Sequence, residues 1–214
     1  MLSILWGEAP DVFKQVLEFY VEPYSSILDL TYGNGKMWRS LDERYTMHLT
    51  TNDVDPESPS QFHVPFHQIA DFLKGVRKGL LNIDAAIYDP PYKYEQPSHY
   101  LRLNHGGLAL HHGENDLDWK ANKTKWMVQD QVSTAEVLNT ELPKILRDGG
   151  SVIVKIMNTR LKGNLIANDR IIIDAFTNFS LFDQVVYVRT LTGLFHNIKR
   201  AQVAHGFYLI FKKI

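Results

Sequence analysis

The tetrapeptide Asp89-Pro90-Pro91-Tyr92 constrains the fold more than any other stretch of the chain. It follows an apolar run at 83–88, which predicts a short buried β-strand. Two successive prolines cannot continue a central strand, because proline lacks the N–H donor that a sheet requires, so the chain must leave the sheet there. Asp89 is therefore expected at the carboxyl end of a strand, where open α/β sheets bind their ligands.

These four residues suit chemistry on the exocyclic amine of a nucleobase, which is a poor nucleophile because its lone pair is delocalised into the ring. The Asp89 carboxylate and the Pro90 carbonyl can both accept N–H groups of such an amine, and the proline pair stiffens the turn. Tyr92 offers a flat face on which a base can stack. The alternative is a strand-ending turn with an aspartate cap and no function of its own.

A second strand-like segment, at 26–30, leads into a turn that contains Gly33 and Gly35. Glycine permits positive φ and a close approach of the backbone to a ligand. The third glycine of the dinucleotide fingerprint is absent, since Trp38 stands three positions after Gly35, so a nicotinamide cofactor is disfavoured. Asp53 follows the next strand-like segment and is placed to bind ribose hydroxyls, with a simple turn as the alternative.

With these residues in view, the chain resembles the class I S-adenosylmethionine-dependent amino-methyltransferases. Among them it most resembles the DNA adenine-N6 methyltransferases of small phage and prophage type. The resemblance rests on the glycine turn, the acid after the second strand and the Asp-Pro-Pro-Tyr element, and it extends from Ile27 to the carboxyl terminus. The chain departs from the family at Leu30 and Thr31, where the common motif has Pro and Phe.

The resemblance implies a single-domain, Rossmann-like α/β fold with a seven-stranded, mostly parallel sheet and an antiparallel last strand. It implies S-adenosylmethionine as cofactor, no metal, and methyl transfer to the N6 amine of adenine in DNA. The absence of cysteine fits a reducing cytoplasm, and the expected location is the cytoplasm of a bacterium or of a phage-infected host. The cofactor-binding residues would be Asp29, Thr31, Gly33, Gly35 and Asp53, and the catalytic residues Asp89, Pro90, Pro91 and Tyr92.

Several alternatives remain open at this point. The acceptor could instead be cytosine N4, an RNA base, a protein amide or a small molecule, or the chain could be a non-catalytic subunit that binds cofactor or nucleic acid. Aspartate at position 89 favours adenine, because cytosine-N4 enzymes of the family more often carry serine there. The chain has no cysteine, which excludes disulfides, thiolate metal sites and cytosine-C5 methylation as the family performs it.

The stretch at 93–130 is too long and too aperiodic for an ordinary connection. Its interleaved aromatic and basic side chains predict a substrate-binding insert within one domain that spans 1–214. His105, His111 and His112 could instead bind a metal, but no carboxylate or further histidine stands at ligand spacing on a clear helix. No metal site is therefore predicted.

Charge is distributed unevenly along the chain. The net charge is −1, but residues 151–214 hold nine Lys/Arg and three Asp/Glu. This excess indicates a side that faces a polyanion such as DNA, with uneven scatter by chance as the alternative. The candidates for contact with nucleic acid are Lys155, Arg160, Lys199 and Arg200. No apolar run is long enough to span a membrane, and no signal-peptide pattern is present.

Periodicity and helix-breaking residues predict the remaining elements. Helices are expected between Ala9 and Pro23, at 67–80, at 133–147 and at 168–176, and strands at 151–156, 182–189 and 207–211. A third strand of the family's sheet is poorly signalled, with only a short apolar piece at 62–66 in its place.

Overall fold

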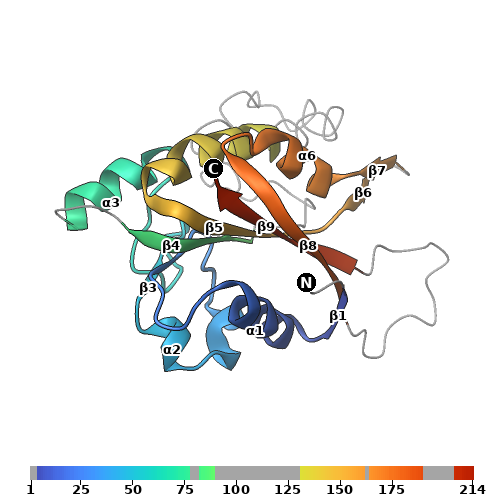
Figure 1. The fold of residues 1–214 in the computed structure, drawn as a ribbon, viewed down its shortest axis with the longest axis horizontal. Coiled ribbons are helices and arrows are strands. Elements are labelled where there is room, and N and C mark those ends of the chain that lie inside the picture. Colours follow the sequence, from blue (N-terminus) through green and yellow to red (C-terminus); the bar gives the residue numbers. More distant parts are fainter. Residues whose placement is uncertain (1–3, 78–81, 90–130, 162–163, 190–204) are drawn as a thin grey trace.

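A seven-stranded sheet forms the centre of the structure, a computed structural model that describes residues 4–77, 82–89, 131–161, 164–189 and 205–214 (Figure 1). The strand order is β1-β8-β9-β5-β4-β2-β3. The strands are β1 (Ile4–Gly7), β2 (Ile27–Asp29), β3 (Leu49–Thr51), β4 (Ile83–Tyr88), β5 (Leu146–Ile156), β8 (Phe179–Arg189) and β9 (His205–Lys213). Only β9 runs antiparallel to its neighbours in this sheet. The expected α/β sheet, mostly parallel with an antiparallel last strand, is therefore confirmed.

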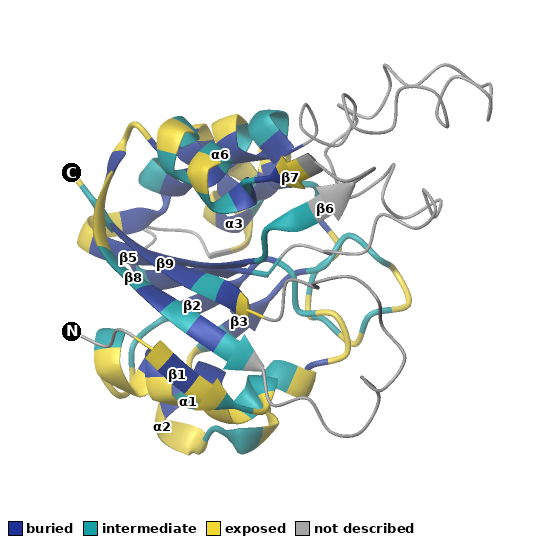
Figure 2. Ribbon diagram, turned by 90° about the vertical axis from the view of Figure 1, so that its right-hand side faces the viewer, coloured by how far each residue is buried: buried dark blue, intermediate teal, exposed yellow. Residues whose placement is uncertain are grey.

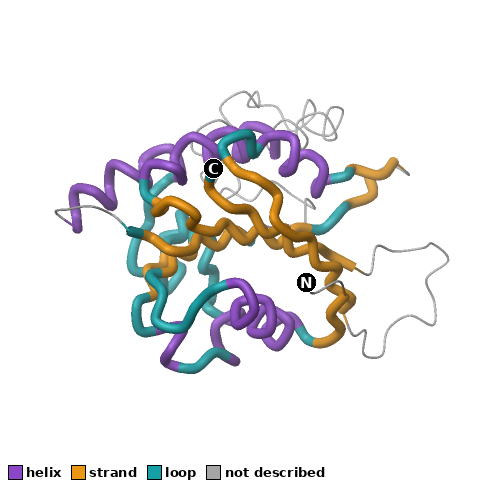
Figure 3. The backbone as a smooth tube through the Cα atoms, viewed as in Figure 1, coloured by secondary structure: helices purple, strands orange, loops and turns teal. Residues whose placement is uncertain are grey.

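Helices cover both faces of the sheet (Figures 1 and 3). One face carries α3 (Ile69–Arg77), a helix at 131–141 and α6 (Asn168–Ala175), and the other carries α1 (Ala9–Tyr20) and α2 (Glu43–Thr46). The shorter elements are the 3₁₀ helices η1 (Lys36–Ser40), η2 (Phe66–Gln68) and η4 (Leu142–Lys144), and a separate hairpin of β6 (Thr159–Leu161) and β7 (Asn164–Ile166). Within the described residues, no helix has both the length and the hydropathy to cross a membrane.

The sheet is buried on both faces because its strands alternate between two apolar cores. On β2, Ile27 joins the core beneath α1, whereas the next residue, Leu28, joins the core beneath α3. Residues Phe13 and Leu17 of α1 lie one helical turn apart and enter the first of these cores. Figure 2 shows the resulting pattern, with buried strands between helices that are exposed on their outer sides. A strand buried on both faces carries no polar alternation that would reveal which way a given side chain points.

In place of the third strand that the family's sheet would have, the described structure has a short segment at 61–64. An isolated bridge joins it to the residues after β3, with the Phe62 N–H donating to the Thr51 carbonyl at 3.1 Å and the Phe62 carbonyl accepting the Asp53 N–H at 3.0 Å. The fully buried amide of Asn52 accepts the Val64 N–H at 2.9 Å and donates to the Val64 carbonyl at 3.0 Å. The Asn52 side chain thus extends a backbone pairing that is too short to form a strand. The seventh strand is β1, which the sequence did not predict and which pairs in parallel with the end of β8.

The prediction of a helix at 133–147 is wrong at its carboxyl end. The helix covers 131–141, and Pro143 then lies in the 3₁₀ turn η4. Proline cannot donate the hydrogen bond that would continue an α-helix and clashes with the preceding turn. The Asp-Gly-Gly at 148–150 lies inside β5, where the pairing with β4 shifts its register and Gly149 has a φ of +68°.

Candidate active site

Three charged side chains meet at the carboxyl edge of the sheet. Asp29 ends β2, Asp89 directly follows β4, and Lys155 stands near the end of β5. These three strands are neighbours and run parallel, with Ile87 of β4 opposite both Asp29 and Ile153. Asp89 lies two residues after Ile87, and Lys155 lies two residues after Ile153. Because side chains along a strand alternate between the two faces, the side chains of Asp29, Asp89 and Lys155 all project toward the face that carries α1.

The central contact of the site is an ion pair between Lys155 and Asp89. The Lys155 Nζ lies 2.7 Å from Asp89 Oδ2, and the two side chains are only 10% and 19% exposed. The Met37 Sδ of η1 lies 3.8 Å from the same Nζ. Removing two charges from water costs several kcal/mol per ion, which their mutual attraction does not reliably repay. A gain in folding stability therefore does not explain why this ion pair is present.

A glycine turn lies next to this pair, between β2 and η1. Gly33 has a φ of +57° and Gly35 a φ of +70°, the left-handed region in which glycine is favoured. A Cβ at Gly35 would lie 2.6 Å from the Tyr32 hydroxyl, so the position admits no side chain without movement. At Gly33, in contrast, no described atom lies within 4 Å of the Cβ position. The backbone there is open to a ligand.

Asp53 holds the glycine turn from the side of β3. Its Oδ2 accepts the Gly33 N–H at 2.7 Å, and its Oδ1 accepts the Asp55 N–H at 3.0 Å. The Ser58 hydroxyl donates to the Gly33 carbonyl at 2.6 Å. The acid predicted to bind ribose thus lies at the edge of the open glycine, and its backbone N–H is held by the Phe62 carbonyl at 3.0 Å.

Asp29 supports the glycine turn from below. Its buried carboxylate accepts the Thr31 N–H at 2.9 Å and the Trp38 indole N–H at 2.6 Å. Burial raises the pKa of Asp29 to about 7, because these two hydrogen bonds only partly offset the loss of water, and the charges of Asp89 and Asp53 raise it further. Asp29 can therefore exchange a proton near neutral pH.

Thr31 joins the glycine turn to the residue that follows β4. Its hydroxyl accepts the backbone N–H of Asp89 at 2.8 Å, while its own N–H donates to Asp29. Phenylalanine, which the common family motif has at this position, could not accept such a bond. The departure from the motif therefore supplies a side-chain hydrogen bond that joins the turn after β2 to the backbone at Asp89.

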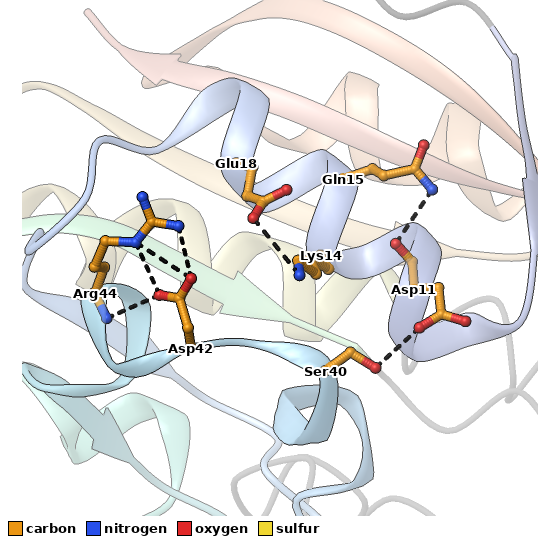
Figure 4. A network of polar contacts seen from close by, with 7 residues as sticks. All are labelled: Asp11, Lys14, Gln15, Glu18, Ser40, Asp42 and Arg44. Atoms are coloured by element: carbon orange, nitrogen blue, oxygen red, sulfur yellow. Dashed lines mark hydrogen bonds and ion pairs between the residues drawn. The ribbon is translucent and has the colours of Figure 1, made fainter.

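The helix η1 completes the surroundings of both carboxylates, because Met37 contacts Lys155 and Trp38 contacts Asp29. Figure 4 shows how η1 is attached to α1, with the Ser40 hydroxyl donating to Asp11 at 2.9 Å. The ring of Phe13 on α1 packs edge-on against Trp38 at a centroid distance of 5.2 Å. The amino-terminal helix thereby positions side chains of the site without entering it.

Most of the residues predicted from sequence come together at this edge. The structure places there Asp29, Thr31, Gly33, Gly35, Asp53, Asp89 and Lys155. Lys155, predicted as a nucleic-acid contact, lies buried beside Asp89 rather than on the surface. Of Arg160 only the backbone, on β6, is described. The predicted Pro90, Pro91, Tyr92, Lys199, Arg200 and the insert at 93–130 lie outside the described residues, so their roles stay predictions.

Sequence reasoning missed the parts that Met37, Trp38 and Asn52 play. Trp38 drew notice only because it stands where a dinucleotide fingerprint has glycine, and nothing in the local pattern linked its indole to Asp29. The described residues contain no group of three or more His, Cys, Asp or Glu side chains that could hold a metal.

Comparison with models of protein families gave no match, and comparison with curated proteins also gave none. Solved structures do match. TrmN from Thermus thermophilus superposes with a TM-score of 0.51 at 11% identity over 96% of this chain, which spans only 49% of that protein. The N-methyltransferase NodS from Bradyrhizobium japonicum, in complex with S-adenosyl-L-homocysteine, gives 0.50 at 11% identity over 95% of this chain and 86% of its own. The chain thus has the Rossmann-like α/β fold of methyltransferases.

Proposed function

We propose that the chain is an S-adenosylmethionine-dependent methyltransferase whose acceptor is the N6 amine of adenine in DNA. The observation that carries the proposal is the position of the Asp89 carboxylate, at the end of β4 and linked through Thr31 to the glycine turn after β2. An acceptor-binding carboxylate and a cofactor-binding turn must adjoin for direct group transfer, since the reacting atoms have to be aligned at short range.

The residues around the glycine turn fit S-adenosylmethionine. Gly33 leaves space for close approach, and the Asp53 carboxylate beside it can accept hydrogen bonds from ribose hydroxyls. Three acidic side chains, those of Asp29, Asp53 and Asp89, lie around this turn, and the Lys155 ammonium offsets the charge of Asp89. Such an environment favours a ligand with positive charge. When bound, the cofactor supplies a methyl group activated by its sulfonium, and the NodS structure shows the same fold with the demethylated product in place.

Asp89 would act on the acceptor amine. A carboxylate accepts hydrogen bonds only, so it can take one N–H of the amine and fix the direction of the nitrogen lone pair. The Pro90 carbonyl, from the turn predicted in sequence, would take the second N–H. No residue needs to form a covalent bond with the base. The contribution of the chain is alignment and a negative charge near the amine as it becomes positive.

Adenine in DNA is favoured over other acceptors by three properties of the sequence. These are the aspartate at position 89, the likeness of the whole motif set to adenine-N6 enzymes, and the basic excess in residues 151–214. A buried base must first leave the double helix, which the aromatic and basic insert at 93–130 would assist.

Methyl transfer from labelled S-adenosylmethionine to three duplexes tests the proposal, namely mixed sequence, adenine-free and cytosine-free DNA, with a structured RNA in parallel. We expect label in the mixed and cytosine-free duplexes alone. Label in adenine-free DNA or chiefly in RNA would assign another acceptor. No label anywhere, with cofactor binding intact, would contradict a self-sufficient enzyme and favour a non-catalytic subunit.

A further inference from the structure

Lys155 and Asp89 place a hydrogen-bond donor beside an acceptor. An ammonium group has three N–H donors and no acceptor, whereas a carboxylate only accepts. Because Nζ and Oδ2 are 2.7 Å apart, a ligand that reaches the carboxylate also reaches the ammonium. The pair therefore recognises two adjacent atoms of a ligand, of which one donates and the other accepts.

The surroundings of Lys155 restrict where its ammonium can go. On the sheet it stands opposite Tyr208 of β9, which is fully buried, and Met37 contacts it from η1. Burial and the charge of Asp89 raise the pKa of Tyr208 well above its ordinary value, so this neighbour stays uncharged. The rest of the strand from Val152 to Ile156 is apolar. Within the described part of the chain, the ammonium of Lys155 is thus directed toward Asp89 and the carboxyl edge.

We propose that Lys155 donates a hydrogen bond to the ring nitrogen N1 of the acceptor adenine while Asp89 accepts from the N6 amine. This inference rests on the proposed function and narrows it. The N6 amine and N1 of adenine are adjacent, one a donor and the other an acceptor, and enzymes that extrude a base read this Watson–Crick edge. An aliphatic amine offers no acceptor beside its N–H groups and could not accept from Lys155, so the pair favours acceptors with an amidine-like edge.

A chemical substitution in the substrate tests this contact without altering the protein. A mixed-sequence DNA oligonucleotide is prepared with adenine, with 1-deazaadenine, which lacks N1, or with 7-deazaadenine, which keeps it. We expect wild-type kcat/KM to fall about 10- to 100-fold for the 1-deaza substrate, the range of one hydrogen bond to a charged group, and to change little for the 7-deaza substrate. Loss of N1 also weakens pairing with thymine and eases base extrusion, so the weaker pairing works against the expected fall in kcat/KM rather than causing it.

The variant Lys155→Met removes the donor and keeps much of the side-chain volume. We expect it to lose activity on adenine and to lose the discrimination between the 1-deaza and 7-deaza substrates, because the contact is already gone. The matched control is Lys212→Met. Lys212 lies on β9 at the far end of the same strand pair and donates to the Ser151 hydroxyl at 2.7 Å. This control should keep both the activity and the discrimination of the wild type.

The results distinguish a Lys155 that binds N1 of the acceptor from a Lys155 that only pairs with Asp89. Equal discrimination by wild type and Lys155→Met, or none by the wild type, would overturn the N1 contact while adenine methylation stands. Absence of methylation of any adenine substrate by the wild type would contradict the proposed function, and this inference with it. If Lys155→Met does not fold, as judged by thermal unfolding, the comparison of the two deaza substrates on the wild type still decides.

Discussion

The strands β4 and β5 carry an acid–base pair at each of their two ends. At the carboxyl end, Asp89 pairs with Lys155, and the side chains are 19% and 10% exposed. At the amino end, Asp84 of β4 pairs with Arg147 of β5, and the side chains are 27% and 50% exposed. Both pairs join an aspartate to a basic side chain across the same two strands, and the clearest difference is the exposure of the cation, which is 10% for Lys155 and 50% for Arg147.

This difference separates a structural pair from a functional one. An exposed pair contributes about 0 to 1 kcal/mol and costs little to form, because water already solvates both charges. A buried pair carries a desolvation cost that its attraction rarely exceeds. The charges at the carboxyl end therefore need another reason, and only that end adjoins the glycine turn with Thr31 and Asp29.

The largest effect is expected when the acid at the carboxyl end loses its charge. Asp89→Asn should lower kcat/KM for methyl transfer by about 1,000- to 10,000-fold, in the range for a positioned group that acts on the reacting proton. Binding of S-adenosylhomocysteine should stay within a few-fold. Asp84→Asn, on the same strand at the other end, should leave kcat/KM within about 3-fold, since exposed charges far from the reacting atoms contribute little.

Initial rates with labelled cofactor give kcat/KM, and calorimetric titration gives the affinity for S-adenosylhomocysteine. If Asp89→Asn abolished cofactor binding, Asp89 would be a structural residue. If Asp84→Asn lost activity to the same extent, the two ends of the strands would not differ in function.

The sequence predicted which residues gather at the carboxyl edge, and the reason is topological. Asp29 and Asp89 follow apolar runs and Asp53 follows the strand-like segment at 46–52, and neighbouring parallel strands bring such positions to one edge. The alternation of side chains did not reveal that Lys155 points inward, because β5 is apolar on both faces.

Contacts between distant segments could not be predicted from local pattern. The Thr31 hydroxyl bonds to a backbone N–H that lies 58 residues away, and motif comparison treated Thr31 only as a departure. The buried amide of Asn52 holds the segment at Val64 through side-chain hydrogen bonds, which no periodicity can signal. Conversely, Pro143 was visible in the sequence and marks the end of the helix that was predicted too long.

The second largest effect is expected in the pH dependence of stability, and it comes from the buried acid Asp29. Its pKa rises from 3.8 to about 7 on folding. Between these values the folded chain holds a proton that the unfolded chain has lost, so the free energy of unfolding must fall as pH rises from about 4 to 7. At 1.36 kcal/mol per pH unit this amounts to roughly 4 kcal/mol. Above pH 7 the effect of this group is complete.

Asp29→Asn does not titrate and isolates this effect. In urea unfolding at a series of pH values, the stability of the variant relative to wild type should improve by roughly 4 kcal/mol between pH 4 and pH 8. If the difference in free energy of unfolding between Asp29→Asn and wild type stayed constant from pH 4 to pH 8, Asp29 would be as ionised in the folded chain as in the unfolded one.

Two glycines with the same backbone geometry extend the comparison to the main chain. Gly35 at the carboxyl edge has a φ of +70°, and Gly149 at the amino edge has a φ of +68°. Alanine at a positive φ costs about 1 to 2 kcal/mol, which is the whole effect expected of Gly149→Ala, because its Cβ would meet no described atom within 4 Å. Gly35→Ala should cost about 2 to 3 kcal/mol, since its Cβ also meets the Tyr32 hydroxyl.

Only Gly35→Ala should also weaken cofactor binding, by about 10-fold or more, because the displaced turn is the proposed binding surface. Urea unfolding and titration with S-adenosylhomocysteine measure the two quantities separately. Equal losses of stability, with unchanged affinity in both variants, would show that the turn at Gly35 has no part in binding.

The smallest change in stability is expected when the pair of Asp84 and Arg147 is broken. Comparing this change with the loss of Lys155 tests most directly whether burial distinguishes the two pairs. Arg147→Met leaves Asp84 with the Ser26 N–H at 2.8 Å and with access to water. The free energy of unfolding should therefore fall by less than about 1 kcal/mol, and methyl transfer should be unchanged. Lys155→Met removes the cation of the buried pair from the same strand and should cost about 3 to 5 kcal/mol, because the Asp89 charge is left without its partner. Similar losses in the two variants would mean that burial does not distinguish the pairs, and the case for a functional role of Lys155 would then depend on the deaza substrates alone.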